Sequence, residues 1–167
     1  ILNIIEEKLD LAENHIDKAI LYFPESSSTM RSKSYAIKGD IAYKHNNIDN
    51  TFNYYALAIE LRPNEIDLYL DRGQYYFELG KLDKAEADFK AILTLDSNNI
   101  YAYGGLGRNY LKEKRYDLAE KNLTKAIQLN ELYYMAIQLR AQTYFEQKKY
   151  KEAILDMVEV ISIEPDD

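Results

Sequence analysis

The chain has 167 residues, 47% hydrophobic and 29% charged, which is typical of an ordered, soluble domain. Its formal net charge of −7 argues against a nucleic-acid partner, because binding a phosphate backbone requires clustered Lys and Arg. No apolar run approaches the roughly 18 residues of a membrane-spanning helix, so we expect no such segment. The sequence has no cysteine, which excludes disulfides and thiolate metal sites.

Residues 1–31 have the pattern of a degenerate N-terminal helix pair. One apolar stripe runs from Ile1 to Ala12 and a second from Ile16 to Phe23, each with helical spacing. We expect these two helices to cover one end of the structure that follows, as atypical terminal units do in stacked arrays. Because the chain begins at Ile1 without an initiator methionine, we also expect it to be part of a longer protein.

From residue 32 onward the sequence repeats every 34 residues. Three columns of this register hold small or apolar side chains: Gly39, Gly73, Gly107 and Ala141; Thr51, Ala85, Ala119 and Ala153; and Leu61, Leu95, Leu129 and Ile163. Four units follow without insertion, over residues 32–65, 66–99, 100–133 and 134–167. Agreement of several columns in one register predicts an array of structural repeats.

Each unit is predicted to form two helices. In the third unit, one helical stripe contains Tyr103, Leu106, Gly107 and Tyr110. A polar turn over residues 113–115 separates it from a second apolar stripe that ends at Leu129. Small residues at Gly107 and Ala119 let the two helices approach closely. With the N-terminal pair, the chain is expected to contain about ten helices.

This pattern resembles the tetratricopeptide repeat (TPR), and the resemblance covers residues 32–167. The matching columns are those above, a Tyr column at Tyr35, Tyr69 and Tyr103, and a proline after the second helix at Pro63 and Pro165. The tyrosines stand where the family usually has Trp, and Ser97 and Glu131 replace the family proline in two units. The resemblance implies an all-α superhelical solenoid of antiparallel helix pairs. It also implies a protein-interaction module that binds a peptide segment or partner helix in a concave groove.

The resemblance places one face of the first helices in that groove. We expect the groove to be lined by Asp40, Tyr43 and Lys44 in the first unit; Leu70, Asp71, Gln74 and Phe77 in the second; Tyr101, Gly104, Gly105, Arg108, Leu111 and Lys112 in the third; and Gln138, Gln142 and Phe145 in the fourth. The bulky column from Tyr43 to Phe145 fits packing between repeats as well as ligand contact.

Gly104 and Gly105 are unusual within a helical stripe, because each interior glycine costs about 0.5–1 kcal/mol relative to alanine. A phosphate-binding loop is not expected, since no strand precedes the glycines and their spacing does not fit. Two explanations are open: a bare groove floor that admits a ligand backbone, or close nesting of neighbouring first helices. Arg108 is a candidate cation to offset the repulsion between Asp67 and Asp71.

One TPR subtype grips the C-terminal carboxylates of chaperones through Lys, Asn and Arg side chains. The corresponding positions here hold Ala36, Asp40, Asp71, Tyr101 and Gly105. A register shifted by one unit gives Leu70, Gln74, Gly105, Met135 and Leu139. Neither set contains the required side chains, so we do not expect that clamp.

An enzyme is the competing class, but no His, nucleophile and carboxylate constellation is evident. His15 and His45 are far apart in sequence and fit solvated positions. We therefore expect no catalytic residue, cofactor or metal, and a protein or peptide as partner. At the C-terminal end, Ile154, Met157 and Ile161 have no covering helix beyond them. The alternative function is therefore a regulatory or oligomerisation segment of a larger signalling or enzymatic protein, which self-associates through this end.

Overall fold

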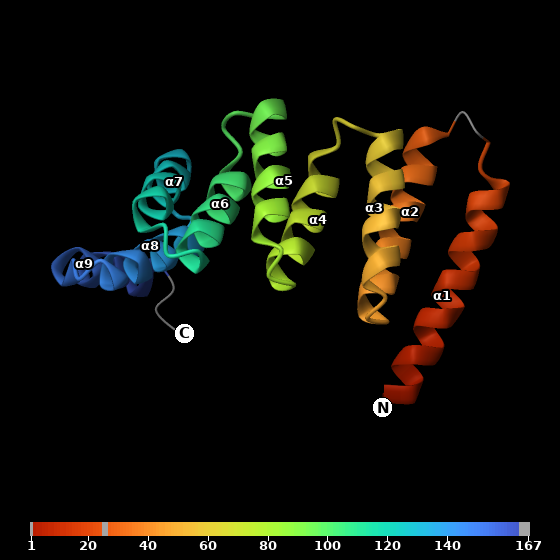
Figure 1. Cartoon of the computed structure of the whole chain (residues 1–167), viewed down its shortest axis with the longest axis horizontal. Helices are drawn as coiled ribbons and strands as arrows, with labels where there is room; N and C mark the ends of the chain where they lie inside the picture. Colours follow the sequence, from red (N-terminus) through yellow and green to blue (C-terminus); the bar gives the residue numbers. More distant parts are fainter. Residues whose placement is uncertain (1, 25–26, 164–167) are drawn as a thin grey trace. The chain divides into compact units, whose positions relative to one another are not determined.

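The computed structural model describes residues 2–24 and 27–163, with side chains from residue 8 onward. These residues form nine α-helices and no strand: α1 (Leu2–Tyr22), α2 (Ser28–Lys44), α3 (Ile48–Leu61), α4 (Ile66–Glu78), α5 (Leu82–Leu95), α6 (Ile100–Lys112), α7 (Tyr116–Leu129), α8 (Tyr134–Glu146) and α9 (Tyr150–Ile163) (Figure 1). The chain divides into two compact units, Ile1–Leu68 and Tyr69–Asp167. Within the described ranges, no helix is long and apolar enough to cross a bilayer.

A single helix, α1, occupies the region where two helices were expected. The half-buried residues Leu9, Ala12, Ile16 and Ala19 continue one stripe in steps of three or four. Residues 13–15 contain no glycine or proline that would end the helix. The predicted N-terminal helix pair is therefore a single helix, and the nine helices of the described residues agree roughly with the expected count of about ten. Ile1, the start of the first predicted apolar stripe, lies outside the described residues. So does Pro165, the proline predicted to follow the last helix.

In the first unit, α1 packs on α2, and α2 packs on α3. Lys38 of α2 is buried and donates a hydrogen bond to Asp17 of α1. Its Nζ also lies 4.6 Å from the centre of the Tyr54 ring on α3. Burial lowers the pKa of Lys38, but hydrogen bonds to Asp17 and Tyr54 outweigh it, so the pKa lies above its ordinary value. Lys38 thus contacts both of the helices that pack on α2.

In the second unit, three helix pairs follow in order: α4 with α5, α6 with α7, and α8 with α9 (Figure 1). The first helix of a pair also packs on the second helix of the pair before it, as α6 does on α5 and α8 on α7. Small residues mark the contacts: the buried Phe89 ring lies against Gly73, and the buried Leu123 against Gly107. The predicted column of small residues is therefore where paired helices meet.

The turn between paired helices has the same backbone conformation in successive repeats. A residue with positive φ recurs every 34 positions, at Asn46 (56°), Gly80 (70°), Lys114 (60°) and Lys148 (62°). This left-handed conformation suits glycine, and a lysine adopts it only where the turn requires it. The repeated turn thereby fixes where Lys114 stands at the end of α6.

Two of the helix pairs contain the same buried ion pair. Arg72 of α4 donates from Nε and Nη2 to the two carboxylate oxygens of Asp88 on α5, at 2.9 and 2.7 Å. Arg140 of α8 pairs with Asp156 of α9 in the same way, at 2.8 Å for both bonds. Side-chain exposure is 19% for Arg72 and 6% for Asp88. A planar guanidinium on a carboxylate gives this two-bond geometry, which fixes the orientation of one helix on the other.

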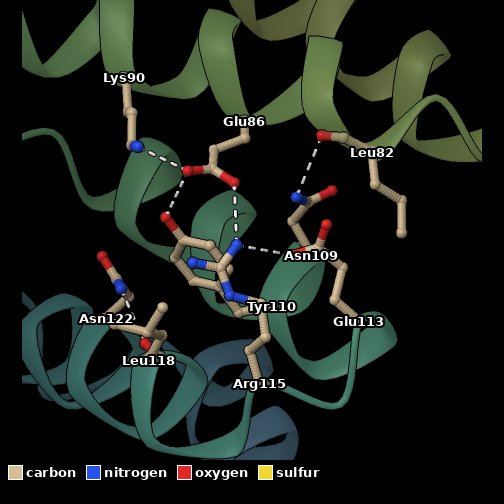
Figure 2. A network of polar contacts seen from close by, with 9 residues as sticks. All are labelled: Leu82, Glu86, Lys90, Asn109, Tyr110, Glu113, Arg115, Leu118 and Asn122. Carbon is tan, nitrogen blue, oxygen red and sulfur yellow. Dashed lines mark hydrogen bonds and ion pairs between the residues drawn. The ribbon is translucent and has the colours of Figure 1, made fainter.

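A polar network joins α5, α6 and the start of α7. Figure 2 shows Glu86 of α5 between Lys90, Tyr110 and Arg115. The Tyr110 hydroxyl donates to Glu86 at 2.8 Å, Lys90 Nζ lies 2.5 Å from the carboxylate, and Arg115 Nη1 lies 3.5 Å from it. Burial raises the pKa of Glu86, but hydrogen bonds from Lys90 and Tyr110 outweigh it and the resulting pKa is below its ordinary value.

Replacing Glu86 by glutamine is expected to make the free energy of unfolding less dependent on pH in the acid range. An acid whose pKa is lowered by folding stabilises the fold above its unfolded pKa, near 4.5, and loses that contribution as the pH falls through the folded pKa. The native chain should therefore lose more unfolding free energy than Glu86→Gln between about pH 5 and pH 3. Urea unfolding followed by circular dichroism measures this difference, and parallel profiles would contradict it.

Candidate functional site

A pocket of about 440 Å³ opens between the first helices of the second unit. We call it the glycine pocket, and it is lined by Leu70, Asp71 and Gln74 of α4; Phe89 of α5; Tyr101, Gly104, Gly105 and Arg108 of α6; Tyr133 before α8; and Met135 and Leu139 of α8. Seven of these residues belong to the predicted groove, so the structure brings that part of the prediction together.

Gly104 and Gly105 are both buried, and each has an aromatic ring packed against it. A Cβ added to Gly105 would lie 2.7 Å from Cε1 of Phe89, and one added to Gly104 would lie 2.9 Å from the Tyr133 hydroxyl. The glycines thus admit rings from α5 and from the segment before α8. The nesting explanation named neighbouring first helices as the contact, and the packed neighbours are different ones.

Two tyrosines form one wall of the glycine pocket. The rings of Tyr101 and Tyr133 meet edge to face, with centroids 5.9 Å apart. Burial raises the pKa of the Tyr133 hydroxyl, while the nearby charge of Arg108 acts in the opposite direction. Tyr101 is 56% exposed, so it offers a ring at the mouth of the pocket. Such a ring is suited to stacking on an apolar or planar ligand group.

Arg108 lies in the same pocket without an acidic partner. Its Nη2 donates to Oε1 of Gln74, and its guanidinium carbon lies 4.0 Å from the centre of the Phe77 ring. Its Nε is buried with no hydrogen-bond partner in the described residues. No ion pair joins Arg108 to a carboxylate among residues 8–24 and 27–163. The suggestion that Arg108 offsets the repulsion between Asp67 and Asp71 stays a prediction.

A second pocket, of about 310 Å³, shares Arg108 and Leu139 with the first. We call it the basic pocket, and its lining is Phe77, Arg108, Leu111, Lys112, Lys114, Tyr116, Leu139, Gln142 and Glu146. It adds Phe77, Leu111, Lys112 and Gln142 to the predicted residues that lie together. Lys112 Nζ stands 4.6 Å from the centre of the Phe77 ring, so that ring packs between repeats and also lines a pocket.

An apolar hollow of about 750 Å³ lies on α8 and α9, at the C-terminal end of the second unit. Gln138, Gln142 and Phe145 of the predicted groove line it, with Phe145 60% exposed. Ile154 is 63% exposed and Ile161 60%, which confirms the prediction that this end is bare. Part of the fourth unit's predicted groove surface thus lies beside this C-terminal face.

The three groove residues predicted in the first unit lie on α2. Asp40 accepts a hydrogen bond from the Tyr55 hydroxyl at 2.5 Å, so it has a role in joining α2 to α3. Tyr43 is half-buried and Lys44 is exposed. Their part in ligand binding stays a prediction.

A larger hollow of about 770 Å³ runs along α7, but most of its lining residues are charged or polar. It is formed by Tyr103, Asp117, Glu120, Lys121, Asn122, Thr124, Lys125, Gln128 and Lys149. Lys149 already pairs with Glu120 at 2.8 Å. With one aromatic residue and mostly charged or polar neighbours, this surface lacks the apolar floor that a peptide site needs.

Four lining residues of the glycine pocket are not in the predicted groove set: Phe89, Tyr133, Met135 and Leu139. Met135 and Leu139 lie on the same face of α8 as Gln138 and Gln142. Phe89 lies on a second helix, and its register column held a signal: Tyr55, Phe89 and Leu123 are all large and buried. Within the part of the chain that the structure describes, no group of three or more acidic or imidazole side chains could hold a metal ion.

Comparison with sequence families gives matches over most of the second unit. Models described as tetratricopeptide repeat match residues 66–99, and also 100–131 and 136–167. A search of curated proteins finds no match.

Solved structures of repeat proteins resemble this chain in fold. The crystal structure of the MamA protein is 25% identical over 81% of this chain and 74% of its own, with a TM-score of 0.72. The second TPR domain of the human RPAP3 protein, in complex with an HSP70 peptide, is 30% identical over 59% of this chain and 82% of its own, with a TM-score of 0.56. YrrB, a TPR protein, is 19% identical over 96% of this chain and 80% of its own, with a TM-score of 0.73. At this identity the likeness concerns the fold alone. These matches confirm the predicted all-α repeat fold.

Proposed function

The chain belongs to the tetratricopeptide repeat family, and we propose that its second unit binds a peptide segment across the glycine and basic pockets. Repeats of this family typically form non-catalytic protein-interaction folds. RPAP3 supports a peptide ligand, since its repeat domain is solved with a peptide from HSP70. We therefore assign the chain a protein-interaction function, without a catalytic role.

The observation that carries the proposal is the continuity of the two pockets. They share Arg108 and Leu139, and together they bring eleven of the sixteen predicted groove residues to one surface. Apolar and aromatic side chains line this surface together with seven charged or polar ones, a mixture suited to an extended peptide ligand. The chaperone clamp is missing at the corresponding positions, so the ligand is held by other contacts than that clamp.

The experiment uses two methionines with nearly equal exposure. Met135 lines the glycine pocket and is 42% exposed, and Met157 lines the C-terminal hollow and is 39% exposed. A random peptide library is selected on the purified chain, and a selected peptide is titrated by fluorescence anisotropy. Met135→Glu should weaken binding at least about tenfold, because it places a charge in the apolar part of the site. Met157→Glu should leave the affinity unchanged.

The opposite pattern contradicts the proposal. If Met157→Glu removes binding and Met135→Glu keeps it, the ligand surface is the C-terminal hollow. A library that yields no binder also contradicts peptide binding. Unchanged melting temperatures in both variants exclude unfolding as the cause.

A second candidate function, self-association, is favoured by the apolar C-terminal face. Leu155 is 69% exposed, Val158 57% and Ile161 60%, beside Ile154. A patch of this kind is typical of an interaction surface. We propose a second copy of the chain as its occupant, in the regulatory or oligomerisation role set out as the alternative.

This candidate predicts that the chain is a dimer that dissociates on dilution. Ile154→Glu and Met157→Glu should each give a monomer, because a charge on the face would have to be buried in the dimer. Met135→Glu is the control and should stay dimeric. Light scattering over a concentration series measures the mass, and a native chain that is monomeric at high concentration would rule the dimer out.

A further inference from the structure

The unpaired hydrogen-bond donors of the half-buried Arg108 point to the chemistry of the ligand. A guanidinium is always charged at neutral pH and has five N–H donors. Here one donor is used by Gln74, and the buried Nε has no acceptor in the described residues. Burial lowers the pKa of Arg108, while Tyr133 and Glu78 raise it by their charges. A partly desolvated cation without an anionic hydrogen-bond partner is energetically costly, and an incoming anion would relieve that cost.

The charges around Arg108 favour the side of the basic pocket. That pocket holds three cations, Arg108, Lys112 and Lys114, and one carboxylate, Glu146. The Tyr116 hydroxyl lies 3.5 Å from Glu146 and donates toward it. On the α4 side, Asp71 lines the glycine pocket and Glu78 acts on Arg108 through its charge. An anion is therefore attracted most strongly between Arg108 and the two lysines.

The floor on the other side of Arg108 is apolar. Leu70, Phe89, Met135 and Leu139 line the glycine pocket. Because the two pockets share Arg108 and Leu139, a single short segment reaches both. In an extended peptide, neighbouring residues are about 3.3 Å apart and point to opposite sides, so side chains two positions apart face the same surface.

We propose that the groove selects peptides that place a carboxylate at Arg108 and an apolar side chain, next to it or two residues away, in the glycine pocket. This inference rests on the proposed peptide-binding function and adds the chemistry of the ligand. The carboxylate comes from an Asp or Glu side chain or from the C-terminus of the peptide. A phosphate fits less well, because Asp71 and Glu146 also line the two pockets and would repel its second negative charge.

The test uses a peptide from the random library with its acidic residue changed. The selected peptide is compared with a version that has Gln for Glu or Asn for Asp, and with a version amidated at its C-terminus. The loss of the one carboxylate that Arg108 binds should weaken binding at least about tenfold. In Arg108→Gln the acid and amide peptides should bind equally. Lys151→Gln, which removes an exposed charge on α9, is the matched control and should keep the difference.

Each outcome separates this inference from the proposed function. If Met135→Glu removes binding while both carboxylate changes leave the affinity of the native chain unchanged, the groove binds peptides but the carboxylate inference is wrong. If selected peptides consistently require phosphorylation, the phosphate is the ligand and the inference is again wrong. If Met135→Glu has no effect, the groove itself is not the site. The peptide changes need no protein variant, so misfolding of Arg108→Gln cannot hide the result.

Discussion

Replacing Arg72 by leucine is expected to lower the free energy of unfolding by about 3–5 kcal/mol. The change leaves the carboxylate of Asp88, 6% exposed, buried between α4 and α5 without its two hydrogen bonds. Removing one member of a buried ion pair is strongly destabilising because the other charge stays buried and unpaired. Urea unfolding followed by circular dichroism measures the loss at pH 7.

The repeat itself supplies the control. The positions equivalent to Arg72 and Asp88 in the next unit are Leu106 and Asn122, 34 residues further on. Leu106 is buried, and the Asn122 amide donates to the carbonyl of Leu118 at 2.7 Å. The double change Arg72→Leu with Asp88→Asn should therefore restore most of the stability lost in the single variant. A double variant as unstable as Arg72→Leu would contradict the account of the ion pair.

The difference in unfolding free energy between Arg72→Leu and the native chain should also become smaller at low pH. Burial already raises the pKa of Asp88, and Arg72 acts against that rise. Without Arg72 the folded pKa should rise further. An acid with a raised folded pKa destabilises the fold as the pH rises through that value, so the defect of Arg72→Leu should be smaller at pH 4 than at pH 7.

Gly105→Ala is expected to lower the free energy of unfolding by about 1–3 kcal/mol. Helix propensity alone would give a gain of about 0.5–1 kcal/mol. The overlap decides the sign: the added Cβ would lie 2.7–2.9 Å from three atoms of the Phe89 ring. That ring is 2% exposed and also lies against Gly73, so it has little room to move.

A double-mutant cycle with Phe89→Leu isolates this contact. In the Phe89→Leu background the alanine at position 105 should be neutral or stabilising, because the ring that it meets is gone. Thermal unfolding of the four proteins gives the coupling. If Gly105→Ala stabilises the native background by about 0.5–1 kcal/mol, the glycine serves an open groove floor and not packing.

The fold could be predicted wherever the 34-residue register held. The columns of Gly73 and Ala85 located the helix contacts because small residues are needed at each of them. The register failed at the N-terminus, where a pair was inferred by analogy with the later units. The local spacing from Leu9 to Ala19 shows one stripe, and no residue there stops a helix.

The site could be predicted only in part, because the register describes one helix face at a time. It placed Gln74 and Arg108 in the groove, but it did not predict the hydrogen bond between them. The Gln74 contact depends on how α6 packs against α4, and no spacing within a repeat encodes that packing. Phe89 and Tyr133 enter the pocket from a second helix and from a turn, so a list of first-helix residues could not include them.

The most direct test of the central claim uses the three methionines of the chain as reporters. Met135 lines the glycine pocket, Met157 lines the C-terminal hollow, and Met30 lies on α2 in the first unit, 53% exposed. With ¹³C-methyl methionine, a selected peptide is titrated and the three methyl signals are followed by NMR. The account predicts that the Met135 signal shifts in a saturable way, while those of Met157 and Met30 stay in place. A saturable shift of Met157 or Met30 with Met135 unchanged would contradict it.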